Sequence, residues 1–182
     1  MRSSWGVVLT VVLAACGVAA TVRAGQLAPR QALLGVWQLV SAKDYRPNGE
    51  GLDWMGSAPS GTIIYTAGGR MAVQFLRDPR AKLAGSSMWT TDGRDLLASA
   101  TAAEIRDAHT SYYAYFGTYT LDEQTRTITH HLQASVRPEE IGRNYVRPFE
   151  MTDGQLVFRY SVTAADGERR TRVIVFTRAE SF

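Results

Sequence analysis

The sequence predicts an all-β protein: an eight-stranded antiparallel up-and-down barrel with one short α-helix near residues 102–112. Two observations predict this class. Short runs of β-branched and aromatic residues recur from Leu33 onward, and turn-forming residues separate them, a pattern typical of antiparallel strands. Closing the sheet is the simplest way to remove its exposed edges. A flattened two-sheet sandwich is the competing architecture.

Eight runs are each interpreted as one strand. They cover residues 33–43, 60–66, 70–76, 114–121, 127–136, 144–151, 155–162 and 170–178. The turn chemistry between them agrees, because Gly68 and Gly69 follow the second run, Gly154 precedes the seventh and Gly167 precedes the eighth. Glycine in such short connections is typical of β-hairpins.

One segment departs from the strand pattern. Thr101 and Glu104 form a capping box, in which each side chain can bond to the other's backbone amide, so a helix should follow. Ile105, Ala108 and Tyr112 recur at helical spacing, and we expect this apolar stripe to lie across a barrel opening or pack on its wall. Two further breaks are a long loop over residues 77–100 and a short turn over residues 138–142.

The first residues have the features of an export signal. Arg2 precedes an apolar stretch over residues 5–22, and Ala24 ends a small-residue cleavage motif. Residues 1–24 are therefore interpreted as a signal peptide, and we expect an exported protein, periplasmic or secreted.

A second cleavage position is also possible within the same stretch. Cys16 ends a Leu-Ala-Ala-Cys sequence that looks like a bacterial lipobox. Cleavage there would remove residues 1–15 and lipidate Cys16, leaving residues 16–31 as a flexible tether to the barrel domain at 32–178. Cys16 is the only cysteine, so no disulfide can form within one chain.

The small net charge of the chain argues against a nucleic acid or an anionic membrane surface as a partner. The chain has 20 Lys and Arg against 17 Asp and Glu, a net charge of +3. Without residues 1–24, which contain Arg2 and Arg23, the balance falls to +1. We therefore expect no nucleic-acid partner, and membrane contact only through the signal or a lipid anchor. The oligomeric state is left open.

Side-chain alternation assigns the strand faces. In the fifth run, Ile128, His130, Leu132 and Ala134 form the apolar face, so His130 points inward and His131 points to water. Adjacent residues on opposite faces cannot share one metal ion, and no metal or other cofactor is predicted.

Arg147 shares a face with Tyr145, Phe149 and Met151 in the sixth run. If that face is the interior, the cation requires a carboxylate, a water cluster or an anionic ligand head group. The alternatives are an internal ion pair, or a face inverted by a bulge at Pro148.

The inward set defines the candidate site. Its aromatic and polar members could line a ligand cavity, or they could simply fill the barrel. The candidate ligand-binding residues are Met71, Phe75, Tyr115, Tyr119, His130, Tyr145, Arg147, Phe149, Phe158 and Tyr160.

Gly35 and Trp37 stand at the start of the first strand, and further matching segments cover residues 33–42, 61–77, 115–122 and 127–136. Together these segments resemble the bacterial lipocalin-like domain family of the calycin superfamily. The resemblance implies a barrel with an apolar interior and little about chemistry. It also implies a structural role for Gly35 and Trp37, with Arg178 or Arg172 from the last strand packing over the indole. The long loop and the missing disulfides depart from secreted lipocalins.

Three functions are compatible with these features. The first is an exported carrier of a small, mostly apolar or amphipathic molecule. The second is a cavity enzyme, an isomerase, cyclase or hydrolase, with His130 as general acid or base, Tyr115 or Tyr119 as proton partner and Arg147 stabilising an anion. No nucleophile elbow, phosphate loop or dinucleotide fingerprint supports it. The third is an envelope lipoprotein that contacts other proteins.

Overall fold

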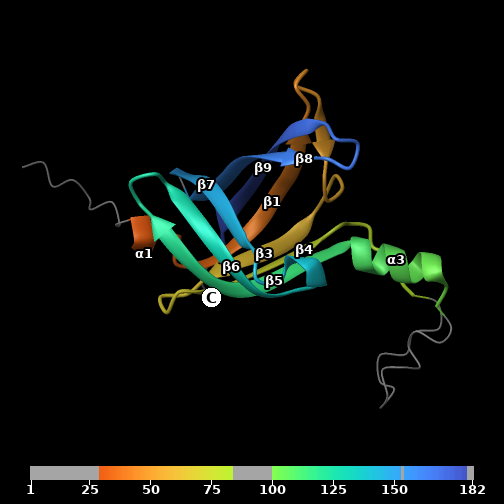
Figure 1. Ribbon diagram of the computed structural model, residues 1–182, viewed down its shortest axis with the longest axis horizontal. Helices are drawn as coiled ribbons and strands as arrows, with labels where there is room; N and C mark the ends of the chain where they lie inside the picture. Colours follow the sequence, from red (N-terminus) through yellow and green to blue (C-terminus); the bar gives the residue numbers. More distant parts are fainter. Residues whose placement is uncertain (1–28, 84–99, 153, 180–182) are drawn as a thin grey trace, which may run out of the picture.

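The computed structural model describes residues 29–83, 100–152 and 154–179 (Figure 1). Cys16 and both predicted cleavage positions lie outside the described residues, as does most of the predicted long loop. None of the described helices is long and apolar enough to cross a membrane.

Within the described residues, one antiparallel sheet closes into an eight-stranded up-and-down barrel, with one additional short strand beside β1. The predicted fold class is confirmed. The strands are β1 (Gly35–Tyr45), β2 (Gly51–Asp53), β3 (Ser60–Tyr65), β4 (Arg70–Leu76), β5 (Tyr112–Asp122), β6 (Thr127–Ser135), β7 (Asn144–Thr152), β8 (Gln155–Thr163) and β9 (Arg169–Arg178). The helices are α1 (Pro29–Leu33), α3 (Ala102–Thr110) and the single 3-10 turn η1 (Pro138–Glu140).

Pairing of β1 with β9 closes the sheet. The register runs from Trp37 opposite Arg178 to Tyr45 opposite Thr171, with an irregularity at Val40. β2, which the sequence analysis did not predict, pairs only with the end of β1 and extends the sheet beyond the barrel. Each barrel strand therefore has a partner on both sides, which removes the exposed edges.

The predicted helix is present, but its predicted packing is wrong. α3 has the expected capping box between Thr101 and Glu104. None of its residues is buried, and Ile105 is 39% exposed. Tyr112 belongs to β5, where it pairs with Leu76, because the chain leaves the helix at Ser111. α3 consequently projects away from the barrel wall (Figure 1).

A bulge changes the faces at the end of β6. Gly117 pairs with Leu132 while Phe116 pairs with Ala134, so Gln133 is the extra residue. A Cβ on Gly117 would lie 2.0 Å from the His131 carbonyl oxygen, so only glycine permits this close approach. The prediction that Ala134 points inward is therefore wrong. Ser135 instead pairs with the inward-facing Tyr115.

α1 and Trp37 seal one end of the barrel. Leu33 and Trp37 are 0% and 2% exposed, and the Trp37 indole nitrogen donates to the Leu33 carbonyl at 2.8 Å. The Arg178 guanidinium carbon lies 4.4 Å from the Trp37 ring centroid. Its Nη1 donates to the Leu34 carbonyl at 2.8 Å and its Nη2 to that of Ala32. Arg178 thus joins the last strand, the first strand and α1.

Replacing Arg178 should loosen this sealed end. Arg178→Ala removes a cation–π contact and two charge-assisted hydrogen bonds of an exposed side chain, so the free energy of unfolding should fall by about 1–2 kcal/mol. Urea denaturation measures the change. Arg159→Ala, which removes an outward-facing arginine from β8, is the matched control and should change stability little. Equal stability of the Arg178→Ala variant and the wild type would contradict the assigned role.

Candidate functional site

The end of the barrel opposite α1 differs from the sealed end. Along β1, Trp37 stands at the sealed end and Asp44 near the other. Several inward side chains around that second end remain partly exposed, although they belong to or border the core. We call this region the accessible end, defined by Trp54, Tyr145, Arg147, Tyr160 and Arg172.

The structure brings the ten candidate ligand-binding residues to the inner face of one barrel. Met71, Phe75, Tyr115, Tyr119, His130, Phe149 and Phe158 are buried, and Tyr145, Arg147 and Tyr160 are partly buried. The face of β7 is not inverted, because Pro148 is exposed while Phe149 is buried. The orientation of these side chains is therefore established, and their role in binding stays a prediction.

A hydrogen-bonded cluster surrounds His130. This imidazole is 1% exposed. The Tyr65 hydroxyl lies 2.7 Å from its Nε2 and the Tyr115 hydroxyl 2.9 Å from its Nδ1. Tyr119, the other predicted proton partner, instead donates to the Thr66 carbonyl at 2.9 Å. Sequence reasoning missed Tyr65, although alternation with the buried Ile63 along β3 marks it as inward.

Burial keeps all three groups neutral. It lowers the pKa of His130 well below the ordinary value of 6.5, and the nearby Arg147 charge lowers it further. Burial likewise raises the pKa of Tyr65 and of Tyr115, while Arg147 partly opposes both increases. The site is thus an uncharged imidazole held between two uncharged phenols.

The number of protons in this cluster limits the hydrogen bonds that it can make to a ligand. A neutral imidazole has one N–H donor and one acceptor nitrogen. One tyrosine must therefore donate to His130 while the other accepts from it and keeps its own O–H. Of Tyr65 and Tyr115, one retains a hydroxyl proton that can bond to a group inside the barrel. Both ring nitrogens are engaged, so proton abstraction by His130 would require one of these bonds to break.

Arg147 is held by aromatic rings. Its guanidinium carbon lies 4.1 Å from the Tyr160 ring centroid and 4.6 Å from that of Tyr145. Nη1 donates to the Val146 carbonyl at 3.3 Å. No carboxylate in the described parts of the chain forms an ion pair with it. Cation–π contacts stabilise the side chain without supplying an oxygen acceptor.

The other charged groups at this end are compensated. Arg172 binds Asp44 through two hydrogen bonds of 2.7 and 2.8 Å and lies 3.7 Å from the Trp54 ring centroid. Arg172 therefore packs on Trp54, whereas Arg178 packs on Trp37. The buried Glu140 pairs with Arg137 at 3.4 Å. Arg147 differs from these residues because none of the carboxylates in the described ranges is paired with it.

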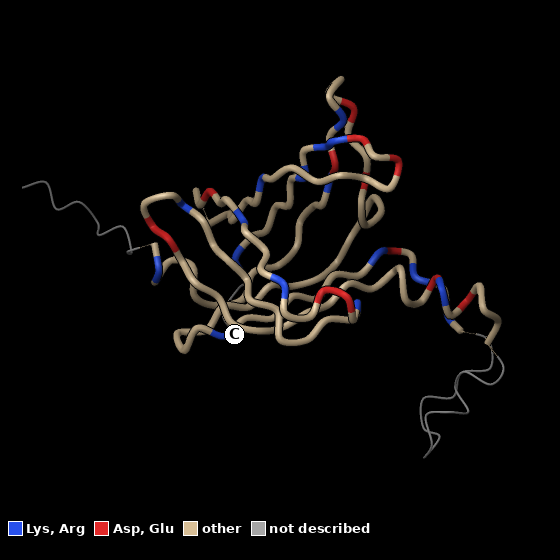
Figure 2. The backbone as a smooth tube through the Cα atoms, viewed as in Figure 1, with Lys and Arg blue, Asp and Glu red and all other residues tan. Residues whose placement is uncertain are grey.

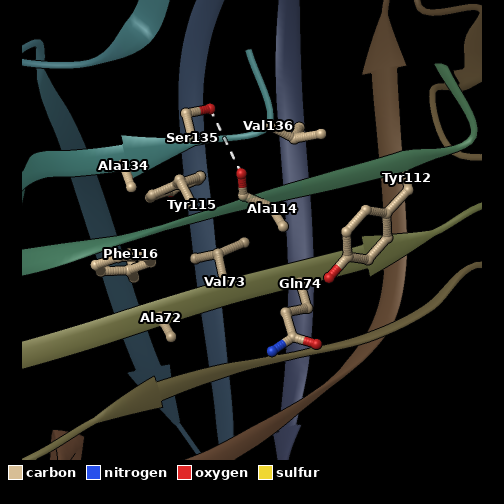
Figure 3. Close-up of a pocket in the computed structure, with 10 residues that line it drawn as sticks. All are labelled: Ala72, Val73, Gln74, Tyr112, Ala114, Tyr115, Phe116, Ala134, Ser135 and Val136. Atoms are coloured by element: carbon tan, nitrogen blue, oxygen red, sulfur yellow. Dashed lines mark hydrogen bonds between the residues drawn. The ribbon is translucent and has the colours of Figure 1, made fainter. Parts of the chain in front are cut away.

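A separate hollow of about 320 Å³ lies across β4, β5 and the end of β6 (Figure 3). Of the ten predicted interior-site residues, only Tyr115 also borders this hollow. Phe116 is 55% exposed and faces outward, and Gln74 and Ala134 share this outer face. The residues that line the hollow are Ala72, Val73, Gln74, Tyr112, Ala114, Tyr115, Phe116, Ala134, Ser135 and Val136.

Charged residues are interspersed over the rest of the molecule. Figure 2 shows Lys and Arg alternating with Asp and Glu at both ends of the barrel and along α3. Within the described residues, no group of three His, Cys, Asp or Glu side chains is placed to hold a metal ion.

A closed antiparallel barrel that is sealed by a tryptophan under an arginine and lined by aromatic side chains defines a calycin-type protein. A family model described as a lipocalin-like domain matches residues 34–179, which covers the whole barrel. The chain belongs to this lipocalin-like family. No curated protein matches it.

The buried His130 should make stability depend on pH. Unfolded histidine binds a proton below about pH 6.5, but native His130 does not, so its contribution is complete above that pH and is lost as the pH falls. Between pH 7.5 and 5.5 the wild type should lose stability from this residue, on the order of 1 kcal/mol, because only the unfolded state gains the proton. Urea denaturation at both pH values measures the loss. His130→Gln should remove this loss and His131→Gln should retain it; an equal pH dependence in all three proteins would contradict the assignment.

Proposed function

We propose that this lipocalin-like protein binds a small, mostly apolar molecule in the barrel interior, through the accessible end. The difference between the two ends carries the proposal. Leu33 and Trp37 at the sealed end are almost completely buried, whereas inward aromatic side chains at the other end remain partly exposed to solvent. A concave aromatic surface with a few placed polar groups is the usual character of a small-molecule site.

The side chains divide the interior into two regions. Phe158, Phe176 and Leu156 supply apolar surface in the core, where each buried methylene of a ligand contributes about 0.8 kcal/mol. Arg147 supplies directional contacts at the accessible end, and the His130 cluster supplies them within the buried interior. This arrangement favours a ligand with an apolar body and a polar group at one end.

Removing an aromatic side chain from the accessible end should weaken ligand binding. N-phenylnaphthylamine, a neutral apolar fluorophore, is a suitable probe of the interior. Tyr160→Ala removes an inward, partly exposed ring and should reduce probe affinity by about tenfold. Phe116→Ala removes a partly exposed ring from the outer hollow and should leave affinity unchanged. Fluorescence titration of the three proteins provides the measurement.

The alternative outcomes are distinct. Loss of affinity in Phe116→Ala alone would place the probe in the outer hollow and contradict an interior site. Absence of binding to the wild type would support a barrel filled by its own side chains. Thermal-shift screening with fatty acids, isoprenoids and aromatic acids extends the test to other apolar compounds.

We also propose that the protein is exported. The first 24 residues support export, because a basic residue precedes an apolar stretch that ends in a small-residue cleavage motif. Intact mass spectrometry of the protein from its own host should show one of two N-termini. A chain starting at Gly25 indicates a free carrier, and a diacylated Cys16 indicates a tethered one. A retained Met1 with the apolar stretch intact would contradict both routes.

A further inference from the structure

We propose that the ligand of the barrel is an amphipathic carboxylate, whose anionic head group binds Arg147 at the accessible end while its apolar part lies in the interior. This inference rests on the proposed function and specifies the class of ligand. Among the inner arginines that the structure describes at the accessible end, Arg147 alone lacks a counter-charge, and this observation carries the inference.

The surrounding carboxylates are committed to other partners. Asp44 receives both of its charge-assisted bonds from Arg172. Glu140 accepts from the Tyr113 and Ser135 hydroxyls at 3.1 and 2.9 Å, in addition to its pairing with Arg137. A third inward arginine, Arg170 of β9, bonds to Glu168 at 2.8 Å and to Asp166. Each of these cations or anions is neutralised within the protein.

Arg147 is different because its contacts leave most of its donors unused. A guanidinium has five N–H groups, and the structure gives Arg147 one hydrogen bond, to the Val146 carbonyl. The Tyr145 and Tyr160 rings hold the group in place. Its N–H groups are therefore available to a carboxylate, which guanidinium can bind through two parallel hydrogen bonds.

The positive charge of Arg147 also reaches the centre of the barrel. After burial, it is the next cause that lowers the pKa of His130, and it opposes the burial-driven rise in the pKa of Tyr115. One hydroxyl proton of the Tyr65–His130–Tyr115 cluster is also free to donate. The Arg147 guanidinium and one phenol hydroxyl thus offer hydrogen-bond donors to this part of the interior.

This set of donors selects the ligand's head group. An ionised carboxylate only accepts hydrogen bonds, and its single charge matches the single guanidinium that lacks an ion pair among the described inward side chains of this end. An ammonium head would place two cations together, and an alcohol would leave the charge of Arg147 unpaired. A carboxylate satisfies both the charge and the hydrogen-bonding requirement.

Length-matched probes test the inference. Decanoic acid and decanol carry the same apolar chain and differ in the head group. Isothermal titration calorimetry near pH 7.5 should show that the wild type binds the acid at least about tenfold more tightly, as expected for a charge-assisted bond pair. Arg147→Gln should abolish this preference, so that the acid and the alcohol bind with similar affinity. Arg159→Gln removes the same charge from the outer face of β8 and should keep the preference.

Each result supports or overturns the inference. Equal affinity of the wild type for acid and alcohol overturns it and leaves the proposed function intact, as does a preference that survives in Arg147→Gln. If neither compound binds, the inference fails, and the Tyr160→Ala titration with the neutral fluorophore decides the proposed function separately.

A second measurement requires no variant and so remains valid if Arg147→Gln does not fold. Decanoic acid labelled with ¹³C at the carboxyl group reports its own ionisation by NMR. Bound to the wild type beside Arg147, the carboxyl pKa should fall below that of the free acid. A bound pKa equal to or above the free value would overturn the inference.

Discussion

Hydrogen bonding between β1 and β9 closes the sheet, and the position of every functional side chain depends on that closure. The same pairing sets Trp37 opposite Arg178 at one end and Asp44 opposite Arg172 near the other. Two arginines of the last strand therefore meet two residues of the first, more than a hundred positions earlier. A one-residue change of register would separate both pairs and would also reverse which side chains face the interior.

The two pairs have different consequences. Arg178 covers Trp37 and binds carbonyls of α1, so this end is sealed by contacts that involve few buried charges. Asp44 and Arg172 form a partly buried ion pair, beneath which Trp54 provides a further contact. Burying charges is unfavourable unless each is compensated. Compensation at this end allows polar side chains to lie near the interior, where a ligand could contact them.

Among the described residues, the buried His130 and Glu140 have polar partners inside the protein, whereas Arg147 lacks a charged one. His130 has a tyrosine on each ring nitrogen, and Glu140 has hydroxyl donors together with Arg137. Arg147 has aromatic contacts and a single backbone acceptor. Aromatic rings stabilise a cation without neutralising it. Arg147 therefore differs from the charged residues that are paired within the protein. Its charge is available to a ligand from outside the chain.

Local sequence patterns determined the strands, the hairpin turns, the capping box and the inward orientation of His130 and Arg147. These features depend on neighbouring residues and on the two-residue period of a strand. Only the tertiary structure decided that Tyr65 and Tyr115 bind His130 and that Arg172 binds Asp44, because each contact joins separate strands in a particular register. It also decided that no carboxylate of the described residues lies beside Arg147. The outward turn of Ala134 and the exposed stripe of α3 were mispredicted for the same reason: a bulge and a helix exit alter the period without a clear signal in local composition.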